Sequence, residues 1–217
     1  MDLGKTVSHS MSVLKDNLIL VVPTVLSTAV AAAMTIAAGR YSASETYPPF
    51  VGLAVMVVNF FAHGVTLEMA KEAMEGGSTS LRTGARAVAA YFAFFLVAAL
   101  IMAVVITVGL ALHVIPGVVA IFFLMFTFPS IVADGLGPLE AIKRSFAAVR
   151  ANLKEAVILF LLLAAISFLF SIGNMFLSVI PVAGIALALG LSGLLGAYMA
   201  LVVMKAYMEM RCRVVPC

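Results

Sequence analysis

The chain alternates between long apolar segments and shorter polar connections, and six of the apolar segments are long enough to cross a membrane. A hydrocarbon core about 30 Å thick requires about 20 apolar residues in an α-helix. The segments of this kind are 18–38, 50–70, 87–112, 117–134, 156–178 and 184–204. Short connections follow the odd-numbered segments: 39–49, 113–116 and 179–183. The pattern predicts an all-α, polytopic integral membrane protein with six transmembrane helices in three antiparallel hairpins.

The polar connection before the fifth segment predicts an amphipathic helix that lies in the membrane interface. Gly137 precedes this helix, and Pro138 suits its first position. Its apolar residues recur at helical spacing: Leu139, Ile142, Phe146, Val149 and Leu153. Its basic residues are Lys143, Arg144, Arg150 and Lys154. We expect these basic side chains to contact lipid headgroups. A similar apolar stripe precedes the first segment: Leu3, Val7, Met11, Leu14 and Leu18.

The two amphipathic stretches also resemble each other in sequence. Aligning Ser10 with Ser145 places Asn17 over Asn152, directly ahead of a span in both cases. A shorter copy at 80–86 precedes the third span. Repeats that each combine an interfacial helix with a hairpin are therefore predicted within one membrane domain, 1–217. The predicted pseudo-repeats are 1–76, 78–134 and 137–210.

Charge fixes the predicted orientation. Twelve of the thirteen Lys and Arg residues lie in the two tails and in alternate connections, and Arg40 is the exception. Because basic residues are retained on the cytoplasmic side, we expect a multi-pass protein of the cell membrane with both termini in the cytoplasm. A mean hydropathy of +1.20 with only 11% charged residues excludes an ordinary soluble domain. The basic residues behind the net charge of +3 are distributed according to this orientation, so the charge does not indicate nucleic-acid binding and no nucleic-acid partner is expected.

A proline in the fourth segment and acidic residues in the second and fourth segments have predicted structural roles. Pro129 lacks an amide donor, so a kink is expected in the fourth segment. Asp134 ends this segment, and we expect it to pair with Lys143 or Arg144, or to cap the next helix. Glu68 and the charges that follow it are expected to form a solvated extension of the second helix.

Residues 126–146 carry a resemblance to a known family. They fit the pattern Pro-x-x-x-x-acidic-x-x-Gly-Pro-x-x-Ala-x-x-x-Ser at Pro129, Asp134, Gly137, Pro138, Ala141 and Ser145. In this run the chain resembles the YciC-like group, which is similar to the membrane domain fused to some glycerophosphodiester phosphodiesterases. The resemblance implies a polytopic membrane architecture of largely unknown function. It does not imply the phosphodiesterase activity, because the sequence contains no such domain.

Polar and small residues within the apolar segments give further candidates. The candidate intramembrane polar site comprises Asn59, His63, Ser167, Ser171, Asn174 and Ser178. Two interpretations stay open for it: a narrow polar path, or hydrogen bonds between packed helices. Small residues recur at every fourth position of the sixth segment: Gly184, Ala188, Ser192, Gly196 and Ala200. This row predicts close packing against a helix of the same chain or of a second copy.

No catalytic motif is present, so we expect no enzymatic activity, no cofactor and no metal site. Cys212 and Cys217 lie together in the C-terminal tail, where a disulfide framework is not expected. The first functional hypothesis is a non-enzymatic, lipid-associated or membrane-organising scaffold protein. Its expected partners are membrane lipid and either a second copy or another membrane protein. The alternative, from a transport class, is a channel or carrier for a small solute or an apolar molecule.

The predicted topology can be tested by labelling cysteines on intact cells with a membrane-impermeant thiol reagent. In a cysteine-free background, Ser44→Cys should react, because it lies in a connection that we expect to face outward. A lone Cys212 should react only after the cells are permeabilised. Labelling of Cys212 from outside would overturn the predicted six-span topology.

Overall fold

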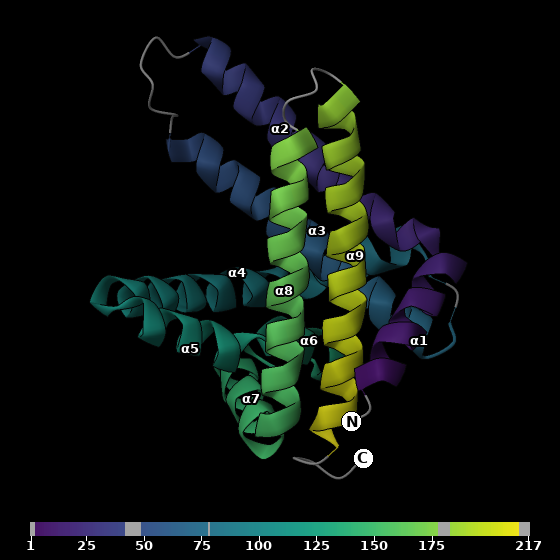
Figure 1. The fold of residues 1–217 in the computed structure, drawn as a ribbon, viewed down its shortest axis with the longest axis vertical. Coiled ribbons are helices and arrows are strands. Elements are labelled where there is room, and N and C mark those ends of the chain that lie inside the picture. Colours follow the sequence, from purple (N-terminus) through teal and green to yellow (C-terminus); the bar gives the residue numbers. More distant parts are fainter. Residues whose placement is uncertain (1–2, 42–48, 78, 178–182, 213–217) are drawn as a thin grey trace.

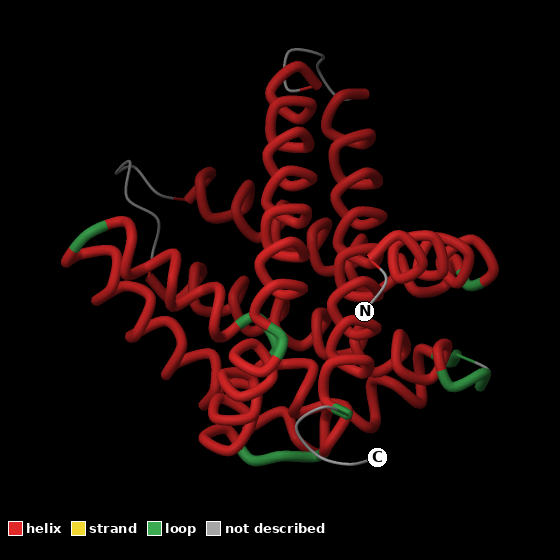
Figure 2. The backbone as a smooth tube through the Cα atoms, turned by 60° about the horizontal axis from the view of Figure 1, so that its bottom comes forward, coloured by secondary structure: helices red, strands yellow, loops and turns green. Residues whose placement is uncertain are grey.

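The computed structural model describes residues 3–41, 49–77, 79–177 and 183–212, and every regular element in these ranges is a helix. The all-α prediction is therefore confirmed. The elements, shown in Figure 1 and Figure 2, are α1 (Leu3–Asp16), the 3₁₀-helix η1 (Leu18–Val21), α2 (Val22–Tyr41), α3 (Pro49–Met74), α4 (Leu81–Leu112), α5 (Val114–Leu124), α6 (Thr127–Asp134), α7 (Pro138–Ala151), α8 (Leu153–Leu177) and α9 (Ala183–Arg211).

Five helical stretches in the described ranges are long and apolar enough to cross a membrane. They are Val51–Met74, Leu81–Leu112, Val114–Asp134, Leu153–Leu177 and Leu187–Arg211. A sixth is reached if Gly4–Asp16 and Leu18–Met34 count as one span, although these two helices are bent by 95°. Because of this bend α1 does not extend α2. The fold thus has five to six candidate spans where the sequence predicts six.

Each hairpin is preceded by a helical stretch that ends at a backbone interruption. Asn17 (φ −132°, ψ 62°) separates α1 from η1, and Asn152 (φ −128°, ψ 41°) separates α7 from α8. The predicted short stretch 80–86 is not a separate helix, because it is continuous with α4. Within α4, Tyr91 has non-helical angles (φ −118°, ψ 17°). The interruptions allow each leading stretch to take a different direction from the span that follows it.

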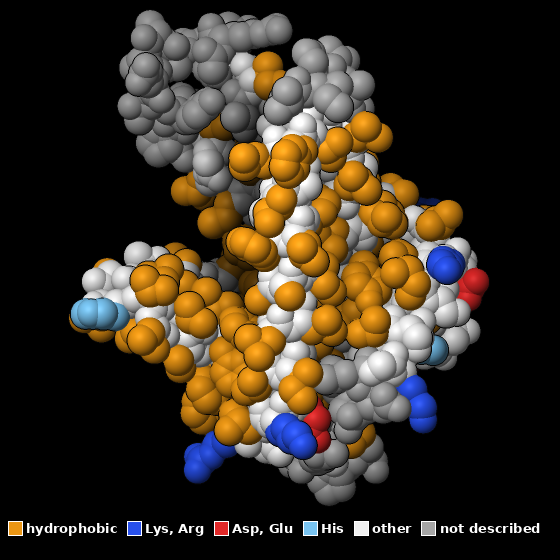
Figure 3. Space-filling view, in the orientation of Figure 1, with side chains coloured by type: hydrophobic (Ala, Val, Ile, Leu, Met, Phe, Trp, Pro, Cys, Tyr) orange, Lys and Arg blue, Asp and Glu red, His pale blue; other side chains and the backbone are white. Residues whose placement is uncertain are grey.

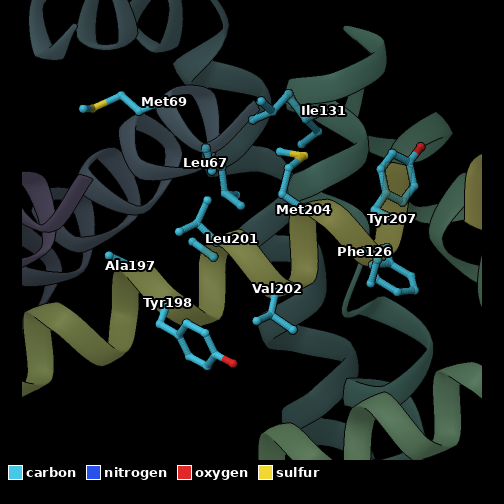
Figure 4. Close-up of a cluster of buried hydrophobic side chains, with 14 of the residues drawn as sticks. Leu67, Met69, Phe126, Ile131, Ala197, Tyr198, Leu201, Val202, Met204 and Tyr207 are labelled. Atoms are coloured by element: carbon cyan, nitrogen blue, oxygen red, sulfur yellow. The ribbon is translucent and has the colours of Figure 1, made fainter. Parts of the chain in front are cut away.

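The three hairpins meet at one end and diverge from there. In Figure 1, α8 and α9 run side by side, α4 and α5 extend away from them, and α2 and α3 form the third arm. The helices α3, α6 and α9, which return the chain in each hairpin, contact one another. At this junction Leu67, Met69, Ile131 and Met204 are at most 1% exposed (Figure 4). The core of the fold therefore lies at the junction of the hairpins.

The arm formed by α2 is joined to α9 through a close approach of the two backbones. The hydroxyl of Thr24 donates a hydrogen bond to the carbonyl oxygen of Gly193 at 2.8 Å. A Cβ atom on Gly193 would lie 2.1 Å from a methyl group of Val25 and 3.0 Å from its backbone nitrogen. Gly193 is not part of the predicted row of small residues. From that row, Gly196 contacts Thr24 and Ala200 is buried, whereas the side chains of Ala188 and Ser192 are partly exposed. Gly184 at the start of α9 is also buried.

Gly193→Ala should destabilise the protein, because the added methyl group has no space between α9 and Val25. We expect the free energy of unfolding in detergent micelles to fall by about 1–3 kcal/mol, as for other overpacked positions. Gly190→Ala is the matched control, since a Cβ at Gly190 meets nothing within 4 Å. Both substitutions carry the same helix-propensity gain. Equal stability of the two variants would contradict the close approach.

Candidate functional site

The break between α5 and α6 is filled by a side chain from α7. Pro129 cannot donate a hydrogen bond back to Met125, and the helix is interrupted at Met125 and Phe126. The amide of Phe126 instead donates to Ser145 Oγ at 3.1 Å, and the hydroxyl of Ser145 donates to the carbonyl oxygen of Phe123 at 2.7 Å. Ser145 is fully buried. One serine therefore satisfies two backbone groups that the broken helix leaves unpaired.

A second buried serine joins α6 to α7. The hydroxyl of Ser130 lies 2.8 Å from the carbonyl oxygen of Thr127 and 3.1 Å from that of Ala141. Ala141 is completely buried, so the two helices lie close together at this point. The chain reverses between them through Gly135, whose φ of 65° is in the left-handed region that favours glycine. The pattern within 126–146 thus describes a folded corner.

Asp134 pairs with the end of α9, not with α7. Its Oδ1 lies 2.5 Å from Arg211 Nη1, and its Oδ2 accepts a hydrogen bond from the hydroxyl of Tyr207. The expectation that Asp134 pairs with Lys143 or Arg144 is therefore wrong. The N-terminus of α7 also has no side-chain cap, so Asp134 does not cap it. The sequence could not reveal this pairing, because the partners come from a helix more than seventy residues away.

A second acid–tyrosine pair joins α3 to α4. Tyr91 donates to Glu68 Oε2 at 2.6 Å, at the interruption within α4. Lys71 Nζ lies 3.8 Å from Glu68 Oε1 and donates to the carbonyl oxygen of Val132 at 3.2 Å, which links α3 to α6. Glu68 is only 9% exposed, so the expectation that it belongs to a solvated extension is wrong. Both acids act as connections between hairpins.

The aligned serines are alike in burial, and the aligned asparagines are alike in a local hydrogen bond. Ser10 and Ser145 are both fully buried. The side-chain amide of Asn17 donates to the carbonyl oxygen four residues earlier at 3.1 Å, and that of Asn152 does the same at 3.0 Å. Asn152 also donates to Met210 in α9 at 3.3 Å. The internal repeat as a whole stays a prediction.

The predicted headgroup-contacting residues lie on the accessible side of α7 and at the start of α8. Lys143, Arg150 and Lys154 are exposed, and Arg144 is partly exposed. Lys and Arg side chains are visible along the lower part of the surface in Figure 3. The predicted apolar stripe is divided between two environments. Val149 is fully buried in the protein with its neighbours Ala141, Ser145 and Ala148. Three residues of the stripe remain exposed: Leu139, Phe146 and Leu153.

The predicted intramembrane polar residues do not form one site. Asn59 is exposed and donates to the carbonyl oxygen of Val55 in its own helix at 3.0 Å. His63 packs edge-on against Phe128 of α6, with ring centroids 5.8 Å apart. On α8, Ser167 and Ser171 are exposed and Asn174 is partly exposed; Ser178 lies outside the described residues. Cys212, just after α9, is disulfide-bonded, contrary to the expectation for the C-terminal tail.

Apolar grooves between the diverging arms are features that sequence reasoning missed. The α2–α9 groove has a volume of about 750 Å³ and the α2–α4 groove, which α3 also lines, about 500 Å³. A third, the α1–α9 groove, measures about 410 Å³ and includes one residue of α8. Almost all of their lining side chains are aliphatic or aromatic. These grooves could be found only from the tertiary structure, because each is lined by several helices whose relative placement the sequence does not give.

The apolar helices, the polar junction and the grooves define a polytopic, all-α membrane protein. The chain belongs to the DUF7847 family, described as a domain of unknown function, which matches residues 94–209. The matched part includes the α5–α6 break, the corner, and most of α9 with Tyr207. No curated protein and no solved structure gave a match. The family match provides no link to the YciC-like group or to phosphodiesterases.

Ser145→Ala should destabilise the fold, because the amide of Phe126 and the carbonyl of Phe123 would be buried without a partner. We expect a loss of about 1–3 kcal/mol in the free energy of unfolding, measured in detergent micelles. Ser8→Ala is the control, since Ser8 is exposed and bonds only within α1. If Ser145→Ala proved as stable as Ser8→Ala, the bridging role of Ser145 would be refuted.

Proposed function

We propose that this chain is a non-enzymatic integral membrane protein that associates with membrane lipid and organises it. The observation that carries this proposal is the set of apolar grooves between the arms. Their walls present hydrocarbon side chains at the depth of the spans, where the surrounding molecules in a bilayer are acyl chains. Acyl chains that enter the grooves would be held in place by the protein.

The surface of α7 supports the same proposal. Its exposed cations and its exposed apolar residues Leu139 and Phe146 suit a helix that contacts both headgroups and acyl chains. Leu153 and Lys154, both exposed, continue this surface at the start of α8. In the orientation expected from the charge distribution, this surface would face the anionic cytoplasmic leaflet of the cell membrane. The resemblance of residues 126–146 to the YciC-like group agrees with this architecture and adds no mechanism.

The alternative function, a channel or carrier, receives less support. A polar path requires polar groups that face a common space. Asn59 on α3 and Ser167 and Ser171 on α8 are instead exposed on separate helices. Solute flux into vesicles containing the purified protein would test the alternative directly. Flux that is abolished by both His63→Leu and Asn174→Leu would favour it over the lipid-associated function.

Neutralising the basic residues of α7 and of the start of α8 should reduce the enrichment of anionic lipid around the protein. The test variant changes Lys143, Arg144, Arg150 and Lys154 to Gln. Each basic side chain near an anionic surface contributes about 1 kcal/mol, so the variant should lose most of its preference for phosphatidylglycerol. The measurement is the lipid composition of nanodiscs assembled with the protein from equal parts of phosphatidylglycerol and phosphatidylcholine.

The matched control keeps the charge and changes only the side chain: Lys143→Arg, Arg144→Lys, Arg150→Lys and Lys154→Arg. It should enrich phosphatidylglycerol as the unmodified protein does. Equal enrichment by the Gln variant would rule out α7 as the lipid-associating surface.

A further inference from the structure

Two of the grooves run into each other beside η1. The α2–α9 groove and the α1–α9 groove share three lining residues: Leu18, Leu191 and Leu194. All three are large apolar side chains that remain substantially exposed, at 64%, 43% and 41%. The two grooves therefore form one branched apolar surface, which we call the η1 groove. It has room for more than one hydrocarbon chain.

The η1 groove has a single charged residue in its lining, Lys15. Lys15 lies on the same face of α1 as Met11 and Leu14, which also line the groove. Its neighbour Asp16 points to another face of α1, where Ser12 lies 3.5 Å from its carboxylate. Within the described part of the chain, Lys15 has no ion-pair partner. The groove thus combines hydrocarbon walls with one available positive charge.

The length of the η1 groove matches one leaflet of a bilayer. Along α9, its lining extends from Tyr198 to Leu187. Eleven residues of α-helix correspond to about 16 Å. Half of a hydrocarbon core about 30 Å thick is about 15 Å. Lys15 lies with Tyr198 in the α1–α9 groove, whereas Leu187 lies in the α2–α9 groove, so the charge is at one end of the apolar surface.

We propose that the η1 groove binds one anionic glycerophospholipid, with its phosphate group at Lys15 and its two acyl chains in the two branches. This inference rests on the proposed lipid association and narrows it to one lipid class at one place. Charge complementarity selects an anionic headgroup over a zwitterionic one, because the lysine has no carboxylate partner within the groove. The separation of charge and apolar surface matches the division of a phospholipid into headgroup and chains.

The test is a titration of the full-length, delipidated protein in detergent, followed by native mass spectrometry. Phosphatidylglycerol and phosphatidylcholine with the same acyl chains serve as probes. The unmodified protein should saturate with one phosphatidylglycerol per chain at low concentration. Lys15→Gln should weaken phosphatidylglycerol binding about fivefold, the factor expected for one lysine near an anionic group, and leave phosphatidylcholine binding unchanged. Lys15→Arg should restore the binding.

A second variant tests the acyl chain sites separately from the charge. Gly190 lines the α2–α9 branch, and a Cβ there meets nothing within 4 Å, so Gly190→Phe places its ring in the groove without displacing the backbone. It should weaken the binding of both lipids. Arg82→Gln removes an exposed cation that lies outside both the η1 groove and the predicted headgroup contacts, and it should change neither affinity.

Unchanged phosphatidylglycerol affinity in both Lys15→Gln and Gly190→Phe would overturn the proposal. The proposal would also be overturned if the protein formed a dimer that retains no lipid and that Gly190→Phe dissociates. The groove would then be an interface between two copies. The neutralised α7 variant separates this site from the broader function. If that variant keeps its nanodisc enrichment while Lys15→Gln loses one-to-one binding, the role of α7 fails and the groove site stands. If instead the neutralised variant loses its nanodisc enrichment while Lys15→Gln keeps one-to-one binding, the groove site fails and the role of α7 stands.

Discussion

The contact of Asp134 with Arg211 and Tyr207 is the interaction on which the arrangement of the hairpins depends. A carboxylate at the end of an apolar helix is tolerated only when a charge or several donors compensate for its lost hydration. Here the compensation comes from α9, so the carboxylate fixes the end of α9 beside α6. Ile131 and Met204 can then meet in the buried junction (Figure 4). The polar contact and the core therefore support each other.

Hydrogen bonds replace the hydrophobic effect as the main source of specificity in this fold. Lipid is as apolar as the side chains it surrounds, so apolar contact alone does not select one helix pairing over another. Glu68 with Tyr91, Thr24 with Gly193, and Asn152 with Met210 each join a different pair of helices. The arms beyond the junction diverge (Figure 1). This divergence produces the grooves on which the proposed lipid association rests.

The local features of the fold were predictable from the sequence because they depend on neighbouring residues. The length and hydropathy of each span follow from the bilayer thickness, and the break upstream of Pro129 follows from its missing amide donor. The interruption after α1 falls at Asn17, directly before the first predicted segment. Pro138 begins α7 as its fixed backbone angle favours. The order of the apolar helices could thus be read from the chain.

Only the tertiary structure decided which residues meet. Asp134 has two basic residues within ten positions, yet it binds Arg211, 77 positions away. Glu68 reads as part of a charged, solvated run and is buried against Tyr91. Gly193 lies outside the regular row of small residues and makes a close approach of α9 to α2. Helical periodicity assigns a residue to a face of its own helix. Which other helix packs against that face depends on how distant segments are arranged in space, and a local sequence pattern does not give this arrangement.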